Sequence, residues 1–288
     1  MIDIKSRKDF LVVVRSNGER TTDLVRLALE MQGVPQEDTY LLSEKPLFRA
    51  TKKMFELAIT SGKTWLISID SDVVPTQKFV SQLISYAEAA DSNFIEGHGY
   101  VLDKFFDMPR CVGNRIYRVA SLPQIMSELD NVTTEIRPEA ALMRFARSQG
   151  MTSNNIPMIV GYHDYNQFYR DIIRTAMQYS EKHSDYMAYL AHVWKKKIRD
   201  TTDADFFFAL KGCGEKENTA ISSNLDLCAI FGYEFAEKKA IASAEAVQII
   251  QDCDHIPRKY FWASFGIDLF FRSYDKYRRL VMSFKGIV

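Results

Sequence analysis

The stretch TWLISIDSD, from Thr64 to Asp72, decides the fold of this chain. Its apolar run, 65–69, is short and nearly continuous, a pattern typical of a parallel strand that is covered on both faces. Two aspartates, Asp70 and Asp72, follow directly. Because open α/β sheets bind ligands just beyond the carboxyl ends of such strands, we expect both carboxylates in a ligand site.

Two neighbouring carboxylates at a buried strand end repel each other unless a positive group lies between them. A hard divalent cation that also binds phosphate oxygens is the usual solution, so the pair predicts a site for a metal-bound nucleoside diphosphate. The alternative is that one aspartate caps a helix that begins near Pro75 and Thr76. Capping would account for one of the two aspartates but not for both.

Strands and helices alternate around this stretch. We predict strands at 10–14, 39–42, 64–70 and 93–97, and helices at about 21–33, 46–62 and 76–90. Gly33 and Gly62 stand where the first two helices should end. This order predicts an α/β fold with right-handed crossovers and a mostly parallel sheet.

The composition is that of an ordinary globular protein, with 47% hydrophobic and 26% charged residues among 288. Lys plus Arg and Asp plus Glu number 37 each, so no overall positive field argues for a nucleic-acid partner. The four cysteines are widely spaced and form no zinc pattern, so we expect reduced thiols in a cytoplasmic protein. We see no apolar signal region at the N-terminus and no stretch as long as a membrane span.

A second strand end also carries titratable groups. The apolar residues Ile159 and Val160 lead through Gly161 to His163 and Asp164. Neutral imidazole is a common ligand of transition metals, so His163 is a candidate metal ligand, with a structural histidine as the alternative. Asp164 is a candidate N-cap of the long helix that we expect next, or a catalytic carboxylate.

Three motifs lie in order along the first half of the chain: the strand end VVRSN, 13–17; a helix that carries Arg49; and IDSD, 69–72. In this arrangement residues 9–165 resemble the GT-A class of nucleotide-sugar glycosyltransferases, especially the large inverting group called family 2. The resemblance implies a Rossmann-like, mostly parallel sheet that binds the donor. It also implies that an aspartate-x-aspartate pair holds a metal ion and the donor diphosphate.

The resemblance assigns roles residue by residue. The donor-binding positions that it implies are Val14, Arg15, Asn17, Arg49, Asp70 and Ser71. A Mn²⁺ or Mg²⁺ ion would be held by Asp70, Asp72 and His163, with Asp70 also near the ribose and diphosphate. The expected donor is a UDP- or GDP-sugar, and the expected acceptor is a bacterial surface glycan or its lipid-linked precursor.

An inverting transfer needs a base that takes the proton of the acceptor hydroxyl while its oxygen attacks the anomeric carbon. Asp164 and Asp103 are the two candidates. Nearby, Arg110, Arg115 and Arg118 surround Gly113 and are candidates for a phosphate- or acceptor-binding floor, with a solvated loop as the alternative.

Two further groups of residues are considered as parts of a functional site. His98, between Gly97 and Gly99, follows a predicted strand and is placed to face the sugar. A second acidic pair, Asp203 and Asp205, precedes an apolar run and is expected to cap a helix rather than to bind metal.

We expect two domains, a catalytic domain over 1–165 and a mainly helical region over 166–288. Helices are predicted at about 166–199, with an interruption near Ser184, and at 224–250 after a glycine-rich loop at 211–214. The tail from Pro257 interleaves basic and aromatic residues, which suits peripheral contact with an anionic membrane surface on its inner face. Packing on its own domain, or on a second subunit of a homo-oligomer, is the alternative.

Two rival functions are considered. A haloacid-dehalogenase-type phosphatase also places Asp-x-Asp after an apolar strand, but it requires a later acidic pair and a lysine, and no such acidic pair follows here. A non-catalytic nucleotide-sugar-binding protein is the second rival. Retention of both aspartates and of His163 favours the transferase.

Overall fold

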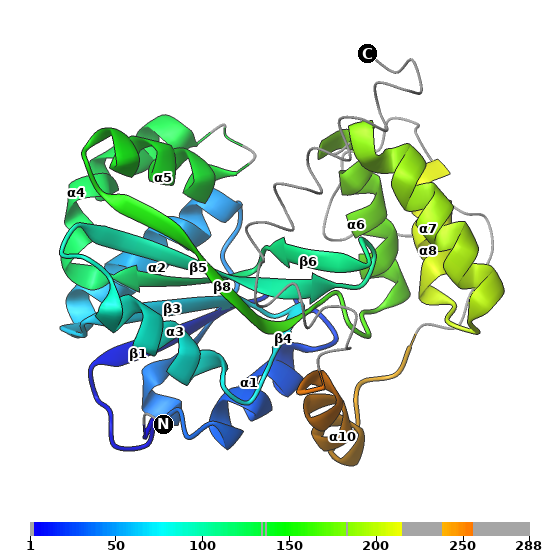
Figure 1. Ribbon diagram of the computed structural model, residues 1–288, viewed down its shortest axis with the longest axis horizontal. Helices are drawn as coiled ribbons and strands as arrows, with labels where there is room; N and C mark the ends of the chain where they lie inside the picture. The colour runs from blue at the N-terminus through cyan, green and yellow to red at the C-terminus, as the bar shows by residue number, and fades with distance from the viewer. Residues whose placement is uncertain (1–2, 134, 136, 183, 215–237, 256–288) are drawn as a thin grey trace.

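The computed structural model describes residues 3–133, 135, 137–182, 184–214 and 238–255. It contains an eight-stranded sheet in the order β2-β1-β3-β7-β5-β8-β4, with β6 paired to β5 (Figure 1). The strands are β1 Phe10–Arg15, β2 Thr39–Leu42, β3 Trp65–Asp70, β4 Val73–Pro75, β5 Phe94–Asp103, β6 Met108–Cys111, β7 Asn114–Arg118 and β8 Thr152–His163. The expected α/β fold is confirmed.

Helices pack on both faces of this sheet. The helices among the described residues are α1 Thr22–Met31, α2 Leu47–Ser61, α3 Phe79–Ala89, α4 Pro123–Met126, α5 Pro138–Ser148, α6 Tyr169–Lys182, α7 Met187–Asp200, α8 Asp205–Gly214 and α10 Ser243–Cys253. Short 3-10 turns lie at Gln36–Asp38, Val119–Ser121, Ser127–Val132 and Ser184–Tyr186. Helices α1 and α3 share a core with the even-numbered residues of β1, whereas α2, α4 and α5 pack on the opposite face.

The sheet is mixed, which corrects the prediction of a mostly parallel one. Strands β1, β2, β3, β5 and β8 run in one direction, but β7 lies antiparallel between β3 and β5, and β4 and β6 are also antiparallel to their partners. The reason is that the chain after β5 turns back through β6 and β7 without a crossover helix. A short antiparallel return of this kind needs no helical signal, so the β-α alternation does not predict it.

The predicted strand at 93–97 is longer in the structure, because β5 continues to Asp103. The helix predicted at 76–90 begins only at Phe79, since Val73–Pro75 pairs with β8 as β4. Lys78 occupies the N-cap position of α3. Neither Asp70 nor Asp72 caps this helix, so the capping alternative is wrong.

Helices α6, α7 and α8 form a separate apolar cluster that also includes Phe105 and Phe106. The interruption predicted near Ser184 is confirmed by the 3-10 turn there. The glycine-rich loop predicted at 211–214 is wrong, because α8 continues through Gly214. Gly212 serves close packing instead, since a Cβ at this position would lie 2.6 Å from the carbonyl oxygen of Ile173 in α6.

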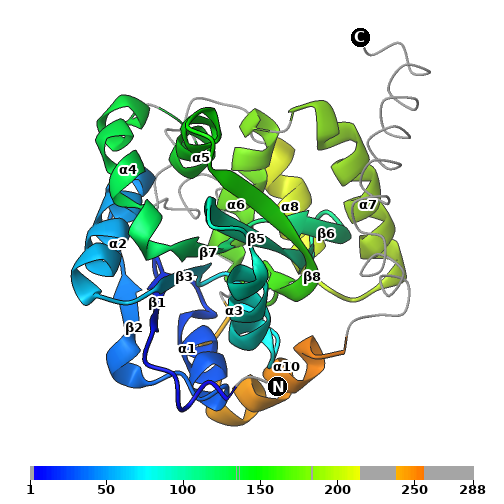
Figure 2. The ribbon, with the colours of Figure 1, turned by 60° about the vertical axis from the view of Figure 1, so that its left-hand side comes forward.

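Helix α10 packs against α1 and β4, at the edge of the sheet remote from α5 (Figure 2). The first part of the predicted helix at 224–250, Cys228 and the tail from Pro257 lie outside the described residues. Among the described helices, none combines the length and the apolar character that a membrane crossing requires.

Candidate functional site

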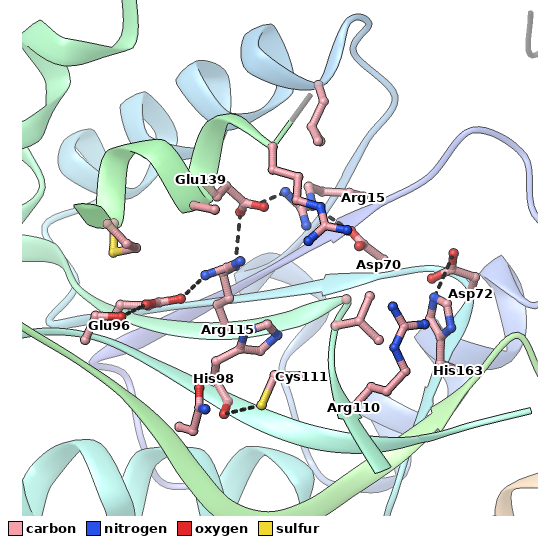
Figure 3. A pocket seen from close by; sticks show the side chains of 18 of the residues that line it. Arg15, Asp70, Asp72, Glu96, His98, Arg110, Cys111, Arg115, Glu139 and His163 are labelled. Carbon is pink, nitrogen blue, oxygen red and sulfur yellow. Dashed lines mark hydrogen bonds and ion pairs between the residues drawn. The ribbon is translucent and has the colours of Figure 1, made fainter. Parts of the chain in front are cut away.

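A polar cleft of about 660 Å³ opens above the sheet, and residues of α5 and of α6 are among those that line it. Figure 3 shows part of this lining from close by. Asp70 ends β3 and Asp72 lies two residues beyond it, Arg15 ends β1, and His163 ends β8. All four side chains line this cleft. The two strand ends singled out in the sequence therefore meet in one site.

Asp70 is paired with a cation of the protein. Its Oδ1 accepts a hydrogen bond from Nε of Arg15 at 2.7 Å, because the parallel register of β1 and β3 places these residues side by side. The Asp70 backbone N–H donates to the carbonyl of Gly113 at 2.7 Å. Gly113 has φ +67, a conformation that favours glycine, and it lets the turn between β6 and β7 approach Asp70.

Asp72 lacks such a partner. Its Oδ1 is buried without a hydrogen bond, and its Oδ2 lies 3.6 Å from Nε2 of His163. Burial raises the pKa of Asp72 well above its usual range, an effect that His163 opposes and that Asp164 and Asp70 reinforce. An orphaned carboxylate oxygen beside other acids is the arrangement that a bound cation would relieve.

His163 is surrounded by carboxylates. Its Nδ1 lies 3.0 Å from Oδ2 of Asp103 and 3.2 Å from Oδ2 of Asp164. Burial opposes protonation, but Asp164 and Asp72 outweigh it and raise the pKa of His163 to about 10. The protonated imidazole therefore supplies a positive charge among these acids, where a metal ion would otherwise supply it.

Three of these groups fit a divalent cation. Ligand atoms of Asp72, His163 and Asp164 all lie within 4.8 Å of one another. Carboxylate oxygens with an imidazole nitrogen suit manganese and related ions. The set contains two of the three residues predicted to hold a metal, Asp72 and His163, together with Asp164. The third predicted ligand, Asp70, is paired with Arg15. With Nδ1 bonded to Asp103, Nε2 of His163 is the nitrogen that points toward Asp72 (Figure 3).

The two candidate bases are both engaged by protein groups. Asp103 is fully buried; it accepts the backbone N–H groups of Phe105 and Phe106 and the guanidinium of Arg110 at 2.6 Å. Although burial opposes ionisation, Arg110 and His163 hold the pKa of Asp103 well below its usual range. Asp164 accepts the hydroxyl of Tyr179 at 3.1 Å.

A network of arginines and glutamates lines the other end of the cleft. Nη1 of Arg15 lies 2.9 Å from Oε1 of Glu139 in α5, and Nε of Arg115 lies 3.6 Å from the same oxygen. Arg115 also forms an ion pair with Glu96, and the hydroxyl of Tyr117 donates to Glu139 at 3.1 Å. Burial opposes the ionisation of Glu139, but Arg15 and Arg115 outweigh this effect and lower the pKa of Glu139 to about 2.

Sequence reasoning missed Glu96 and Glu139. Glu139 follows Pro138 at the start of α5, where an acid is an ordinary first-turn residue. Glu96 stands inside an apolar strand pattern. This position was the one signal in the sequence for Glu96, because an acid in an otherwise buried strand needs a charged or polar partner.

The other predicted donor-binding residues lie away from this cleft. Val14 is completely buried in the core, and Ser71 is buried with its hydroxyl 2.6 Å from Glu19. Asn17 is exposed after β1, and Arg49 is exposed on α2. None of the four is among the described residues that line the cleft.

Of the three arginines around Gly113, Arg110 and Arg115 line the cleft, as the floor hypothesis requires. Arg118 does not: its guanidinium lies over the rings of Trp65 and Phe94 and donates to backbone carbonyls at 91–92. His98 also lines the cleft. Its Nε2 is buried without a hydrogen-bond partner.

The second acidic pair lies outside the site. Oδ1 of Asp203 accepts the backbone N–H of Asp205 at 3.0 Å, at the start of α8, which agrees with the predicted capping role. Both carboxylates also bind Lys104, at 2.7 and 2.6 Å. A protein cation therefore balances this pair, as one balances Asp70.

No family model matches this chain, and no curated protein matches its sequence. Among solved structures it is similar to a glycosyltransferase involved in the glycosylation of the major capsid of PBCV-1, with 15% identity, a TM-score of 0.37, and coverage of 50% of this chain and 80% of that one. It is also similar to a mannose-1-phosphate geranyltransferase from Thermus thermophilus, with 12% identity, a TM-score of 0.34, and coverage of 58% and 79%.

A third similar structure is a putative nucleotide-diphospho-sugar transferase from Desulfovibrio desulfuricans. Its identity is 11% and its TM-score 0.33, and the match covers 67% of this chain and 98% of that one. All three TM-scores lie below 0.5, so these similarities carry no argument about the activity of this chain.

Proposed function

We propose that the chain is a metal-dependent glycosyltransferase of the GT-A type, which moves a sugar from a nucleoside-diphosphate sugar to an acceptor hydroxyl. The observation that supports this most is the cluster of Asp72, His163 and Asp164, of which Asp72 and His163 line a cleft at the carboxyl ends of the strands. Such clefts are where α/β sheets bind nucleotides. The buried, unpartnered Oδ1 of Asp72 is explained if a cation completes the cluster.

In this proposal Asp72, His163 and Asp164 hold Mn²⁺ or Mg²⁺. When bound, the ion would offset the negative charge of the diphosphate that leaves as the sugar is transferred. Asp103 is a positioning residue, because its contact with Nδ1 keeps Nε2 of His163 directed at the cluster. His163 must lose its proton to bind the metal, so metal binding should release protons.

The donor-binding roles stay proposed for residues implied by the resemblance, and the position of two of them supports this. Arg15 and Asp70 are placed in the cleft beside the metal cluster, where ribose and diphosphate groups would lie. Asn17 and Arg49, which are exposed, would contribute only around the outer, nucleoside side of the donor, and the buried side chains of Val14 and Ser71 are given no donor contact. The acceptor stays proposed as a glycan or a lipid-linked precursor.

The rival phosphatase needs a lysine beside its aspartates. Among the described residues that line the cleft there is none, and the cations there are arginines and His163. The lysine that does contact two acids, Lys104, binds Asp203 and Asp205 instead. These contacts favour the transferase over the phosphatase.

Calorimetric titration with UDP and with GDP tests the metal-bridged site. With Mn²⁺ or Mg²⁺ one of the nucleotides should bind, and in EDTA its affinity should fall by on the order of 10-fold or more, since the diphosphate would then face Asp72 and Asp164 unscreened. Equal affinity in metal and in EDTA would contradict the proposal. Release of nucleoside diphosphate from a panel of nucleotide sugars then separates a transferase from a binding protein.

A further inference from the structure

The end of the cleft beneath α5 carries positive charge that the metal cluster does not use. Arg144 and Arg147, three residues apart on α5, line this end, as does Arg137 just before the helix. Arg144 lies 3.7 Å from Glu135 in an exposed pair, and Arg147 donates to the hydroxyl of Ser153 at 3.3 Å. An exposed ion pair of this kind is weak and leaves a guanidinium available to a ligand.

The acids at this end do not neutralise the α5 arginines, because other arginines already hold them. Glu139 lies between Arg15 and Arg115, and Glu96 is paired with Arg115 and accepts the hydroxyl of Ser153. The chain as a whole has a formal net charge of zero, so this local excess of positive charge is not a general property of its surface. It favours an anionic ligand.

His98 adds a second, independent sign of a ligand on the floor of the same cleft (Figure 3). Its Nε2 is buried and has no protein partner. Burial, and then the charge of Arg115, lower the pKa of His98 well below its usual value, so the imidazole is neutral. A neutral nitrogen without a partner can accept a hydrogen bond from a ligand hydroxyl.

This end is separate from the metal cluster. His98 and Asp103 are five residues apart on β5, which corresponds to about 16 Å of extended strand. The β5–β8 register places His163 opposite Asp103 and Ser153 opposite Glu96, so Arg147 lies beyond His98 in the direction away from the cluster. A diphosphate bound at the cluster would therefore be distant from Arg147.

We infer that the α5 end of the cleft is the acceptor subsite and that it takes a phosphorylated sugar. Arg144 and Arg147 bind the phosphate, for which guanidinium geometry is well matched, and His98 accepts a hydrogen bond from a sugar hydroxyl. The inference rests on the proposed function, because it takes the metal cluster as the donor site.

Calorimetry on the full chain, with saturating UDP and Mn²⁺, tests this assignment with glucose 6-phosphate and glucose as probes. Glucose 6-phosphate should bind on the order of 10-fold more tightly than glucose, as expected for charge-assisted hydrogen bonds. The double variant R144Q/R147Q should abolish that difference and leave UDP affinity unchanged. The matched control K195Q/K196Q removes two exposed charges from α7 and should behave as the native chain does.

Other outcomes overturn the assignment. If R144Q/R147Q weakens UDP instead, the arginines serve the donor phosphates. If UDP-glucuronate binds more tightly than UDP-glucose and the double variant removes that gain, the anion belongs to the donor sugar. If R144Q/R147Q and the control K195Q/K196Q lose glucose 6-phosphate affinity equally, the effect comes from the overall charge of the protein and not from a binding site.

Failure of the proposed function has a different signature. UDP would then not bind with Mn²⁺ at all, while glucose 6-phosphate, titrated without nucleotide, would still depend on Arg144 and Arg147. Because both side chains are exposed, Gln should preserve the fold, and an unchanged far-UV CD spectrum checks this. The conservative variant Arg147→Lys keeps the charge but not the bidentate geometry, and its affinity should lie between native and double variant.

Discussion

The two ends of the cleft differ in whether a carboxylate has an arginine of the protein as its partner. Around Glu139 and Glu96 each carboxylate has an arginine of the protein as its partner. Around Asp72 the charged neighbours include Asp164, Asp70 and the imidazole of His163, and one carboxylate oxygen has no partner. At the first end the two glutamates are balanced by arginines of the protein and stabilise the fold, whereas Asp72 at the second end gains from an added cation. Chemistry is therefore expected at the end whose charges the protein leaves unbalanced.

The largest expected effect comes from Asp72→Asn. If the metal supplies several kcal/mol of charge stabilisation to the leaving diphosphate, release of nucleoside diphosphate should fall by on the order of 10³-fold. The far-UV CD spectrum should stay the same, because the native carboxylate has no hydrogen-bond partner at Oδ1 to lose. Asp130→Asn, at an exposed pair with Lys52, is the control and should retain full turnover. Comparable turnover in both variants would remove Asp72 from the mechanism.

Glu139→Gln tests the opposite end. Arg15 and Arg115 would lose a buried partner, so the free energy of unfolding in urea should fall by about 3 kcal/mol. Metal affinity should stay within about twofold of native, since Glu139 is not part of the cation cluster. The exposed pair of Lys52 and Asp130 offers a stability control, where Asp130→Asn should cost less than about 1 kcal/mol. If metal affinity falls with stability, the two ends are coupled and the contrast between them fails.

A smaller effect is expected for His163→Ala. Loss of one ligand should weaken Mn²⁺ binding by on the order of 10-fold, as measured by calorimetry. His255→Ala, at an exposed histidine after α10, is the control and should leave the metal affinity unchanged. Unchanged metal affinity in His163→Ala, together with a lower melting temperature, would make His163 a structural residue.

The smallest predicted effect is a pH dependence that belongs to Glu139. Its pKa is lowered in the folded state from 4.5 to about 2, so the stability that it contributes is present above pH 4.5 and is lost as the pH falls towards 2. In this window the free energy of unfolding of the Glu139→Gln variant should have a shallower slope, by up to about 1.4 kcal/mol per pH unit. Identical slopes in urea titrations would show that other acids dominate acid unfolding.

Local patterns were enough to predict the elements near the site. The apolar runs at 10–14, 39–42 and 65–69 form strands close to their predicted bounds. The runs at 10–14 and 65–69 are buried throughout, as expected for strands covered on both faces, whereas Tyr40 and Leu41 of the edge strand β2 are exposed. Asp70, Asp72 and His163 were identifiable because each follows such a run. The strand ends of a sheet with a common direction meet at one edge, so their meeting in one cleft follows from topology.

Only the tertiary structure decided which carboxylate has a cationic partner and which residue provides it. Asp70 and Asp72 are two residues apart, yet the β1–β3 register gives Asp70 the guanidinium of Arg15 and leaves Asp72 beside His163. Glu139 is distant in sequence from both arginines that it holds. The antiparallel insertion of β7 carries Arg115 into the cleft. The physical reason is that the charge state of a buried group depends on partners brought together by strand register and helix packing, and no local sequence pattern encodes these distances.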